Sequence, residues 1–172
     1  MVAFAIHNLG PFMSKLLSSD CFDSFLLEEA VIRMAVTYTI DGHLNKDFDK
    51  SDAQYDFSDP AQRPFLMQPW SSARLICREM IKGTKAPSSF RFTLVLKPEF
   101  MKKTLQEAPD LQPGTLDAVS ALAINIRLDS GGLHLITGVS ASSFIADKSP
   151  DRIWDRTMER FLAAKGIDFE RE

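Results

Sequence analysis

Two serines in the second half of the chain stand close to a pattern that serine hydrolases use. Gly138, Ser140 and Ser142 nearly match the Gly-x-Ser-x-Gly turn that holds a nucleophilic serine, but the final glycine is missing. The neighbouring residues alternate in hydrophobicity as in a strand, whereas the nucleophile turn connects a strand to a helix. The pattern therefore favours ordinary strand residues over a catalytic serine.

An acidic run that begins at Asp41 has some of the spacing of a calcium-binding loop. Its polar members are Asp41, His43, Asn45, Asp47, Asp49 and Asp52. The run lacks the glycine at the sixth position and the closing glutamate, and a predicted strand precedes it where a calcium loop has a helix. We expect a hairpin arm whose odd positions face water, while Leu44 and Phe48 face the core.

The remaining candidate groups form no recognised site. His7, His43 and His134 have no paired metal-ligand spacing. The glycines of the segment 130–132 lie in a predicted hairpin rather than ahead of a helix, so they form no phosphate-binding loop. The sequence therefore predicts no catalytic, cofactor-binding or metal-binding residue, and no cofactor.

The composition is that of a globular domain. A chain of 172 residues with 45% hydrophobic and 25% charged side chains can bury a core of its own, so we expect a single domain over residues 1–172. Cys21 and Cys77 are far apart and form no C-x-x-C pair, which predicts buried, reduced thiols. No apolar run resembles a signal peptide or reaches membrane-spanning length, and we expect a cytoplasmic protein without a membrane partner.

The charge is distributed unevenly along the chain. The net charge is −3, yet residues 61–103 carry nine basic and two acidic side chains. Arg74, Arg78 and Lys82 recur every four residues and could form a stripe on one helix; the alternative is an ordinary solvated helix face. The overall acidity argues against DNA binding, which needs clustered Lys and Arg, so nucleic acid is a possible partner that the net charge does not support.

The two halves of the chain resemble each other. A shift of 88 residues places Phe4 on Phe92, and aligns the segment 12–17 with 100–105 and Ala30-Val31 with the segment 118–119. We interpret the match as an internal duplication, with repeats at about 1–83 and 90–166. The alternative is that any two strand-helix-strand units look alike at this level.

Each half is predicted to form a βαβββα unit. Alternation predicts short strands at 2–6 and 90–96, helices at 9–17 and 98–105, and longer strands at 30–40 and 122–128. Turns are expected at Asp41-Gly42 and over the segment 129–132, where glycine supplies positive φ. A third strand is expected beyond each turn, near Tyr55 in the first half and near Phe144 in the second. Each half then closes on an amphipathic helix that begins near Trp70 or Trp154, and each ends in Lys-Gly, at 82–83 and 165–166, with glycine as a left-handed cap. Ser149 is the predicted N-cap of the second closing helix.

An insertion distinguishes the first half. Residues 61–69 have no counterpart in the second half and hold an apolar triplet between prolines, Phe65-Leu66-Met67. Since binding residues concentrate on loops over rigid scaffolds, we predict that a partner-binding surface includes this triplet and nearby cations. Its residues are Arg63, Phe65, Leu66, Met67, Arg74 and Arg78. The alternative is that the triplet packs on the domain and plugs an open end of the sheet.

Five motifs resemble a known family. They are F-M-S-K-L-L at 12–17, F-D-S-F-L-L-x-E-A at 22–30, T-I-D-G-H-L-N-K-D-F at 39–48, M-I-K-G at 80–83 and D-K-S at 147–149. Together they resemble a family of small proteins from Gram-positive anaerobes that is catalogued only as a domain of unknown function. The resemblance spans nearly the whole chain and implies no activity, cofactor or catalytic residue.

The predicted fold class is α+β, with a pseudo-two-fold antiparallel sheet assembly and helices packed on it. The element order is analogous to that of sliding-clamp domains and of the TATA-binding protein, but an analogy of fold carries no function. We expect a non-enzymatic binding or adaptor module for a protein or nucleic acid, with a protein partner or self-association favoured. The alternative is an enzyme or small-molecule-binding protein with a cleft between the two halves. A deep pocket with converging polar groups would favour the alternative, and an exposed apolar patch the module.

Overall fold

The computed structural model describes residues 1–47, 56–83, 85–106, 114–143 and 147–172. In chain order these residues form β1 (Ala3–Ile6), α1 (Leu9–Ser18), β2 (Phe25–Arg33), β3 (Thr37–Asp41), the 3₁₀ turn η1 (Arg63–Phe65), β4 (Gln68–Pro69), α2 (Trp70–Ile81), β5 (Ser89–Leu96), α3 (Pro98–Gln106), α4 (Thr115–Ala118), β6 (Val119–Asp129), β7 (Gly132–Ala141), α5 (Ser149–Ala164) and β8 (Phe169–Arg171). The fold class is mixed α+β, as the sequence predicts.

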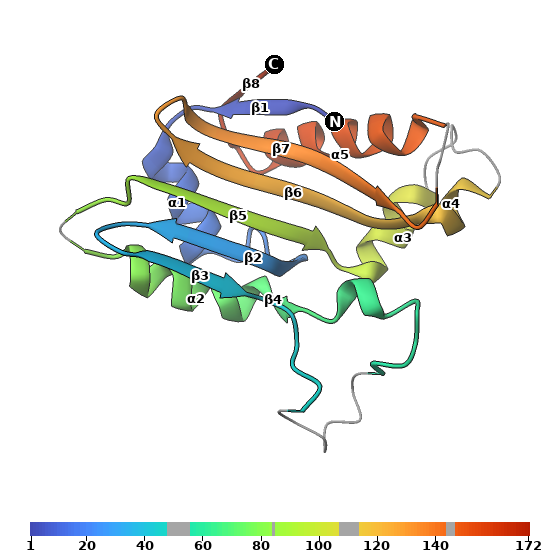
Figure 1. The fold of residues 1–172 in the computed structure, drawn as a ribbon. Coiled ribbons are helices and arrows are strands. Elements are labelled where there is room, and N and C mark those ends of the chain that lie inside the picture. Colours follow the sequence, from blue (N-terminus) through green and yellow to red (C-terminus); the bar gives the residue numbers. More distant parts are fainter. Residues whose placement is uncertain (48–55, 84, 107–113, 144–146) are drawn as a thin grey trace.

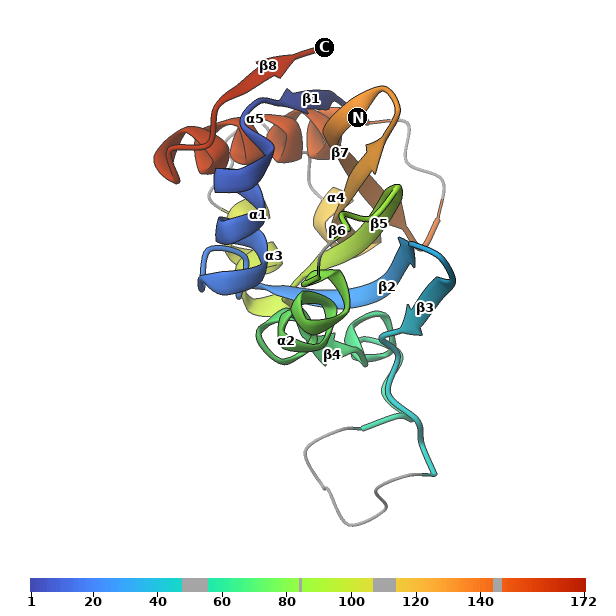
Figure 2. The ribbon, with the colours of Figure 1, turned by 90° about the vertical axis from the view of Figure 1, so that its left-hand side faces the viewer.

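The strands form one open antiparallel sheet of eight strands. Seven of them lie in the order β3-β2-β5-β6-β7-β1-β8, and β4 pairs with β2 off this path. In Figure 1, α1, α2 and α5 lie behind the sheet, and Figure 2 shows how strongly the sheet twists from β8 down to β3. One face of the sheet is thus covered by helices, and we call the other the open face.

Alternation along the strands explains the two faces. On the helix-covered face, apolar side chains of neighbouring strands meet in rows, such as Leu27, Leu94 and Ile124, and all three are fully buried. On the open face the same strands carry polar residues: Arg91 and Arg127 lie side by side on β5 and β6. The main core therefore lies between the sheet and the helices.

Both closing helices are anchored by a buried tryptophan. Trp70 is the first residue of α2 and Trp154 lies in the second turn of α5, and both belong to the main core. The predicted burial of both indoles is confirmed, at 0% and 1% exposure. The predicted burial of the two cysteines is confirmed too: Cys21 and Cys77 are both buried, and they form no disulfide.

The predicted strand 30–40 is wrong, because the chain reverses in its middle. β2 ends at Arg33, β3 begins at Thr37, and the two strands pair as an antiparallel hairpin. The amide of Met34 donates to the carbonyl of Val36 across the bend, at 2.9 Å. Hydrophobic alternation continues through the bend, which is why the pattern shows no break there.

The predicted turn at Asp41-Gly42 is also wrong, although its glycine is required. Gly42 follows β3, and its amide donates to the carbonyl of Glu28 at 2.9 Å. A Cβ at this position would lie 1.9 Å from the backbone oxygen of Leu27. Close approach of two backbones, and not positive φ, selects glycine here.

Two other glycines confirm their predicted roles and one does not. β6 and β7 form a hairpin in which Asp129 pairs with Gly132, whose φ is 112°. Gly166 ends α5 in the left-handed region at φ 62°. Gly83 does not have positive φ, and α2 ends instead with Lys82 in an extended conformation. The N-cap of α5 is Lys148, one residue before the predicted Ser149.

The strand pairing contradicts the predicted pseudo-two-fold sheet. In the second half, β5 pairs directly with β6. In the first half, the corresponding strands β1 and β2 are apart, because β1 pairs with β7 and β8. The expected third strands near Tyr55 and Phe144, and the predicted inward position of Phe48, lie outside the described residues.

Candidate partner-binding surface

The inserted triplet lies on the open face of the sheet. Leu66 and Met67 are 8% and 5% exposed, and Phe65 is half-buried. Met67 belongs to a small second cluster with Leu26, Val95 and Ala121, and Phe65 and Ala123 pack against that cluster. The burial of Leu66 and Met67 favours the alternative reading, in which these side chains plug one end of the open face.

The three predicted cations have different surroundings. Arg63 is exposed in η1. Arg74 forms a bidentate ion pair with Asp23: its Nε and one terminal nitrogen donate to the two carboxylate oxygens at 3.0 and 3.3 Å. The pair connects α2 to the loop before β2. Arg78 is exposed one turn later on α2, on the helix-covered side of the sheet. The structure thus places the triplet and the α2 cations on two different sides of the sheet.

A wide hollow lies where the β2–β3 hairpin meets the end of α2. Its volume is about 600 Å³. We call it the hairpin groove, and its lining residues are Met34, Ala35, Val36, Tyr38, Met80, Gly83, Lys85, Ala86 and Ser88. Val36 and Tyr38 are 56% and 41% exposed, which makes the groove an apolar surface open to solvent.

The rim of the hairpin groove is basic. Lys85 lines it, and Lys82 directly follows α2 beside it. Lys82 forms a 3.3 Å ion pair with Glu79, but both side chains are about two-thirds exposed, so solvent screens the pair. The sequence signal for this rim is the basic segment 61–103. The exposed apolar residues Val36 and Tyr38 have no such signal, because hydrophobic alternation predicts one long strand through them.

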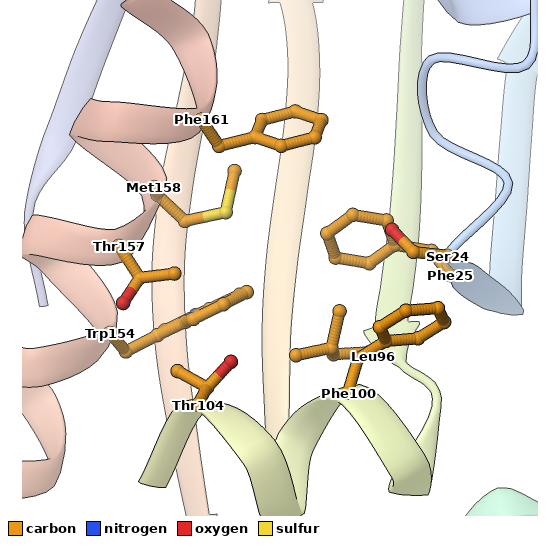
Figure 3. Close-up of a pocket in the computed structure, with 9 residues that line it drawn as sticks. All are labelled: Ser24, Phe25, Leu96, Phe100, Thr104, Trp154, Thr157, Met158 and Phe161. Carbon is orange, nitrogen blue, oxygen red and sulfur yellow. The ribbon is translucent and has the colours of Figure 1, made fainter. Parts of the chain in front are cut away.

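A second, smaller pocket lies at the other end of β2. Its volume is about 150 Å³, and we call it the aromatic pocket. Figure 3 shows its lining side chains: Ser24, Phe25, Leu96, Phe100, Thr104, Trp154, Thr157, Met158 and Phe161. Phe25 begins β2 and Arg33 ends it, so the two hollows lie roughly 25 Å apart along the strand.

The groups with possible chemistry do not converge in the described ranges. His43 is exposed and contacts Asp41 at 2.6 Å, and His134 lies 3.7 Å from Glu172. Burial raises the pKa of the Cys77 thiol to about 12, so it stays protonated. Among residues 1–47, 56–83, 85–106, 114–143 and 147–172, no group of three His, Cys, Asp or Glu could hold a metal ion; Asp49 and Asp52 of the calcium-like run lie outside these ranges.

Comparison with protein families identifies this chain. A family model, described as a family of unknown function (DUF5721), matches residues 15–170. The chain belongs to this family. Searches of curated proteins and of solved structures found no match. Within the part of the chain that the structure describes, no helix is long and apolar enough to cross a membrane. Membership in DUF5721 assigns no activity, so the function has to be argued from the site.

Proposed function

We propose that this protein is a non-enzymatic binding module, which docks an extended, acidic and partly apolar segment of a protein partner in the hairpin groove. The observation that carries this proposal is the groove itself: an open hollow of about 600 Å³ with exposed apolar side chains on its floor. Exposed apolar surface rimmed by polar groups is typical of interaction sites.

The position of β3 supports an extended partner. β3 ends the sheet path in the described residues and pairs on one side only, with β2. An edge strand offers backbone donors and acceptors to an added strand. Tyr38 pairs with Ile32, whose side chain is buried on the helix-covered face, so Tyr38 projects toward the groove side of the edge. Alternate side chains of an added strand would point the same way and enter the groove.

Charge supports an acidic partner. Lys85 lines the groove, and Arg78 and Lys82 lie in and just after the last turn of α2, where Glu79 is the one acid of that turn. Charge complementarity of this kind accelerates association and selects partners more than it adds affinity. None of the six residues predicted from the sequence lines the groove, and Arg78 lies in the last turn of α2 beside it; partner contact by Arg63, Phe65, Leu66, Met67, Arg74 and Arg78 stays a prediction.

The test is selection from a displayed library of random peptides against the full chain. We expect enriched peptides to combine Asp or Glu with at least one large apolar residue. Val36→Ser and Tyr38→Ser should each weaken the selected peptide at least tenfold, about 1.4 kcal/mol. Leu75→Ser is the matched control, because Leu75 is 51% exposed on α2 but does not line the groove.

Three outcomes would contradict this function. Selected peptides without acidic residues would contradict an acidic partner. Equal binding of the peptide by Tyr38→Ser and Leu75→Ser would show that the hairpin groove is not the binding site. Tight binding of a labelled single-stranded oligonucleotide that is lost in Arg78→Glu and Lys85→Glu would favour the nucleic-acid alternative.

The location and origin of the protein are further parts of the proposal. We place it in the cytoplasm of a Gram-positive anaerobe; two buried, unpaired thiols are compatible with a reducing compartment. We also infer that the two halves arose by duplication, followed by a change in how the first strand pairs. The shared order of strand, helix, hairpin and closing helix supports that history.

A further inference from the structure

The aromatic pocket has walls from both halves of the chain. Phe25 of β2 and Leu96 of β5 form one side, and α5 supplies Trp154 and Phe161 on the other. In Figure 3, the Trp154 ring extends from α5 toward the centre, and α3 closes the floor with Phe100 and Thr104. The pocket therefore lies between residues of the two halves of the chain, as a small-molecule-binding cleft between the halves would, although it is small.

These walls are held rigidly by neighbours. The Trp154 Nε1 donates to the carbonyl of Ala123 at 2.8 Å. The Phe25 ring centroid lies 6.4 Å from that of Trp154 and 6.3 Å from that of Phe161, and Phe161 also packs edge-on against Phe22. These contacts fix the positions of the rings around the pocket, whose volume is about 150 Å³.

The polar groups of the pocket are all hydroxyls. Ser24, Thr104 and Thr157 line it, and no ionisable side chain does. The Thr157 hydroxyl donates to the carbonyl of Ile153 at 2.8 Å and points away from the cavity. The Thr104 hydroxyl points into the ring of lining side chains, and within the described part of the chain it makes no hydrogen bond. A hydroxyl such as that of Thr104, placed in an apolar pocket, can fix the orientation of a ligand.

From these features we infer that the aromatic pocket binds a small, neutral aromatic molecule that carries one hydroxyl group. Size supports a single ring, because an engineered apolar cavity of about 150 Å³ in another protein binds benzene. A charged ligand is disfavoured, since no lining group could compensate its desolvation. Phe100 is 42% exposed at the edge of the pocket and leaves a path for entry. The site is independent of the hairpin groove.

The test measures the binding of defined probes to the full chain by ligand-observed NMR and titration. We expect phenol to bind with a dissociation constant below about 1 mM, and benzoate and benzylammonium to bind at least tenfold more weakly. Thr104→Val should weaken phenol about fivefold or more while it leaves toluene unchanged, because only phenol uses the hydroxyl. Intermolecular NOEs from toluene to the Trp154 indole would locate the probe in the unmodified protein.

A cavity-filling variant supplies the decisive comparison. Thr157→Leu should weaken both neutral probes at least tenfold, because the added carbons occupy the pocket. Ala163→Leu adds a larger side chain at an exposed position of the same helix and should change nothing. Equal binding by these two variants, equal affinity for benzoate and phenol, or no NOE to Trp154 at saturating toluene would each overturn the inference.

Discussion

The indole nitrogens of Trp70 and Trp154 connect the closing helices to different parts of the fold. Trp70 Nε1 donates to the carbonyl of Leu16 in α1 at 3.1 Å, and Trp154 Nε1 donates to Ala123 of β6. Each ring also packs on a phenylalanine, Trp70 on Phe92 and Trp154 on Phe25. Each tryptophan therefore combines a large buried apolar surface with one satisfied donor.

Truncation of either ring should be costly. We expect Trp70→Ala and Trp154→Ala each to lower the free energy of unfolding by roughly 3 to 5 kcal/mol, because each leaves a large cavity and removes a hydrogen bond to a backbone carbonyl. Urea denaturation monitored by circular dichroism measures the loss. A loss below about 1 kcal/mol for either variant would mean that its side chain is exposed in solution.

Asp147 contributes stability that depends on pH. Its carboxylate accepts hydrogen bonds from the Ser149 hydroxyl, from the Ser149 amide at 2.8 Å and from the Thr115 hydroxyl at 3.3 Å. The Ser149 hydroxyl, then the Ser149 amide, hold the pKa of Asp147 below its usual range. Because the folded pKa is lowered, the contribution is present above the unfolded pKa of about 4 and disappears as pH falls through the folded pKa.

Asp147→Asn should therefore be less stable than the wild type at neutral pH and approach it in acid. Urea denaturation of both proteins from about pH 8 to about pH 2.5 gives the difference at each pH. The comparison isolates Asp147 from the other carboxyls, since those titrate in both proteins. A difference that stays constant below about pH 4 would show that the charged form of Asp147 does not contribute this stability.

At the scale of elements, the residue after β3 lies unusually close to the backbone of β2. Gly42 leaves no room for a Cβ beside Leu27, whereas Gly10 in α1 has no atom within 4 Å of where its Cβ would lie. Gly42→Ala should destabilise the protein by roughly 1 to 3 kcal/mol through overpacking. Gly10→Ala should stabilise it by about 0.5 to 1 kcal/mol, because alanine loses less entropy in a helix. Equal melting temperatures for the two variants would show that the backbones at Gly42 and Leu27 can move apart at no cost in stability.

The inserted triplet provides a second test among the elements. Met67 is 5% exposed and packs with Leu26 and Val95, so Met67→Ser should cost roughly 2 to 5 kcal/mol, as large-to-small core changes do. The folded fraction should still bind the peptide selected for the hairpin groove. If Met67→Ser instead kept the melting temperature but lost peptide binding, the triplet would be part of the partner-binding surface.

Local sequence patterns explain which elements could be predicted. The β6–β7 hairpin follows from uninterrupted alternation on both sides of a glycine-rich turn, and the stripe of α2 follows from Trp70, Ala73 and Cys77. The bend at 34–36 contains no glycine, proline, asparagine or aspartate, and the alternation of the strand passes through it unchanged. No local signal distinguished a hairpin from one long strand at this point.

At the scale of the whole molecule, the sites depend on contacts that no local pattern encodes. The internal match between the halves predicts equal pairing, yet β1 lies between β7 and β8, far along the sheet from β2. The hairpin groove joins β3 to Met80 of α2 and to residues 85–88, and the aromatic pocket joins β2 and β5 to α3 and α5. The order of the strands in the sheet determines which residues line the groove and the pocket. That order depends on contacts between residues far apart in the sequence.

The central claim is that the hairpin groove and the edge of β3 receive a partner segment. Amide hydrogen exchange with and without the selected peptide tests it most directly, because exchange reports backbone protection residue by residue. The amides of β3 (Thr37–Asp41) that face away from β2, and those of Lys85 and Ala86, should exchange at least tenfold more slowly in the complex, while Pro98–Gln106 should not change. Protection confined to α3 and α5, or to the segment 63–67, with β3 unchanged, would contradict the account.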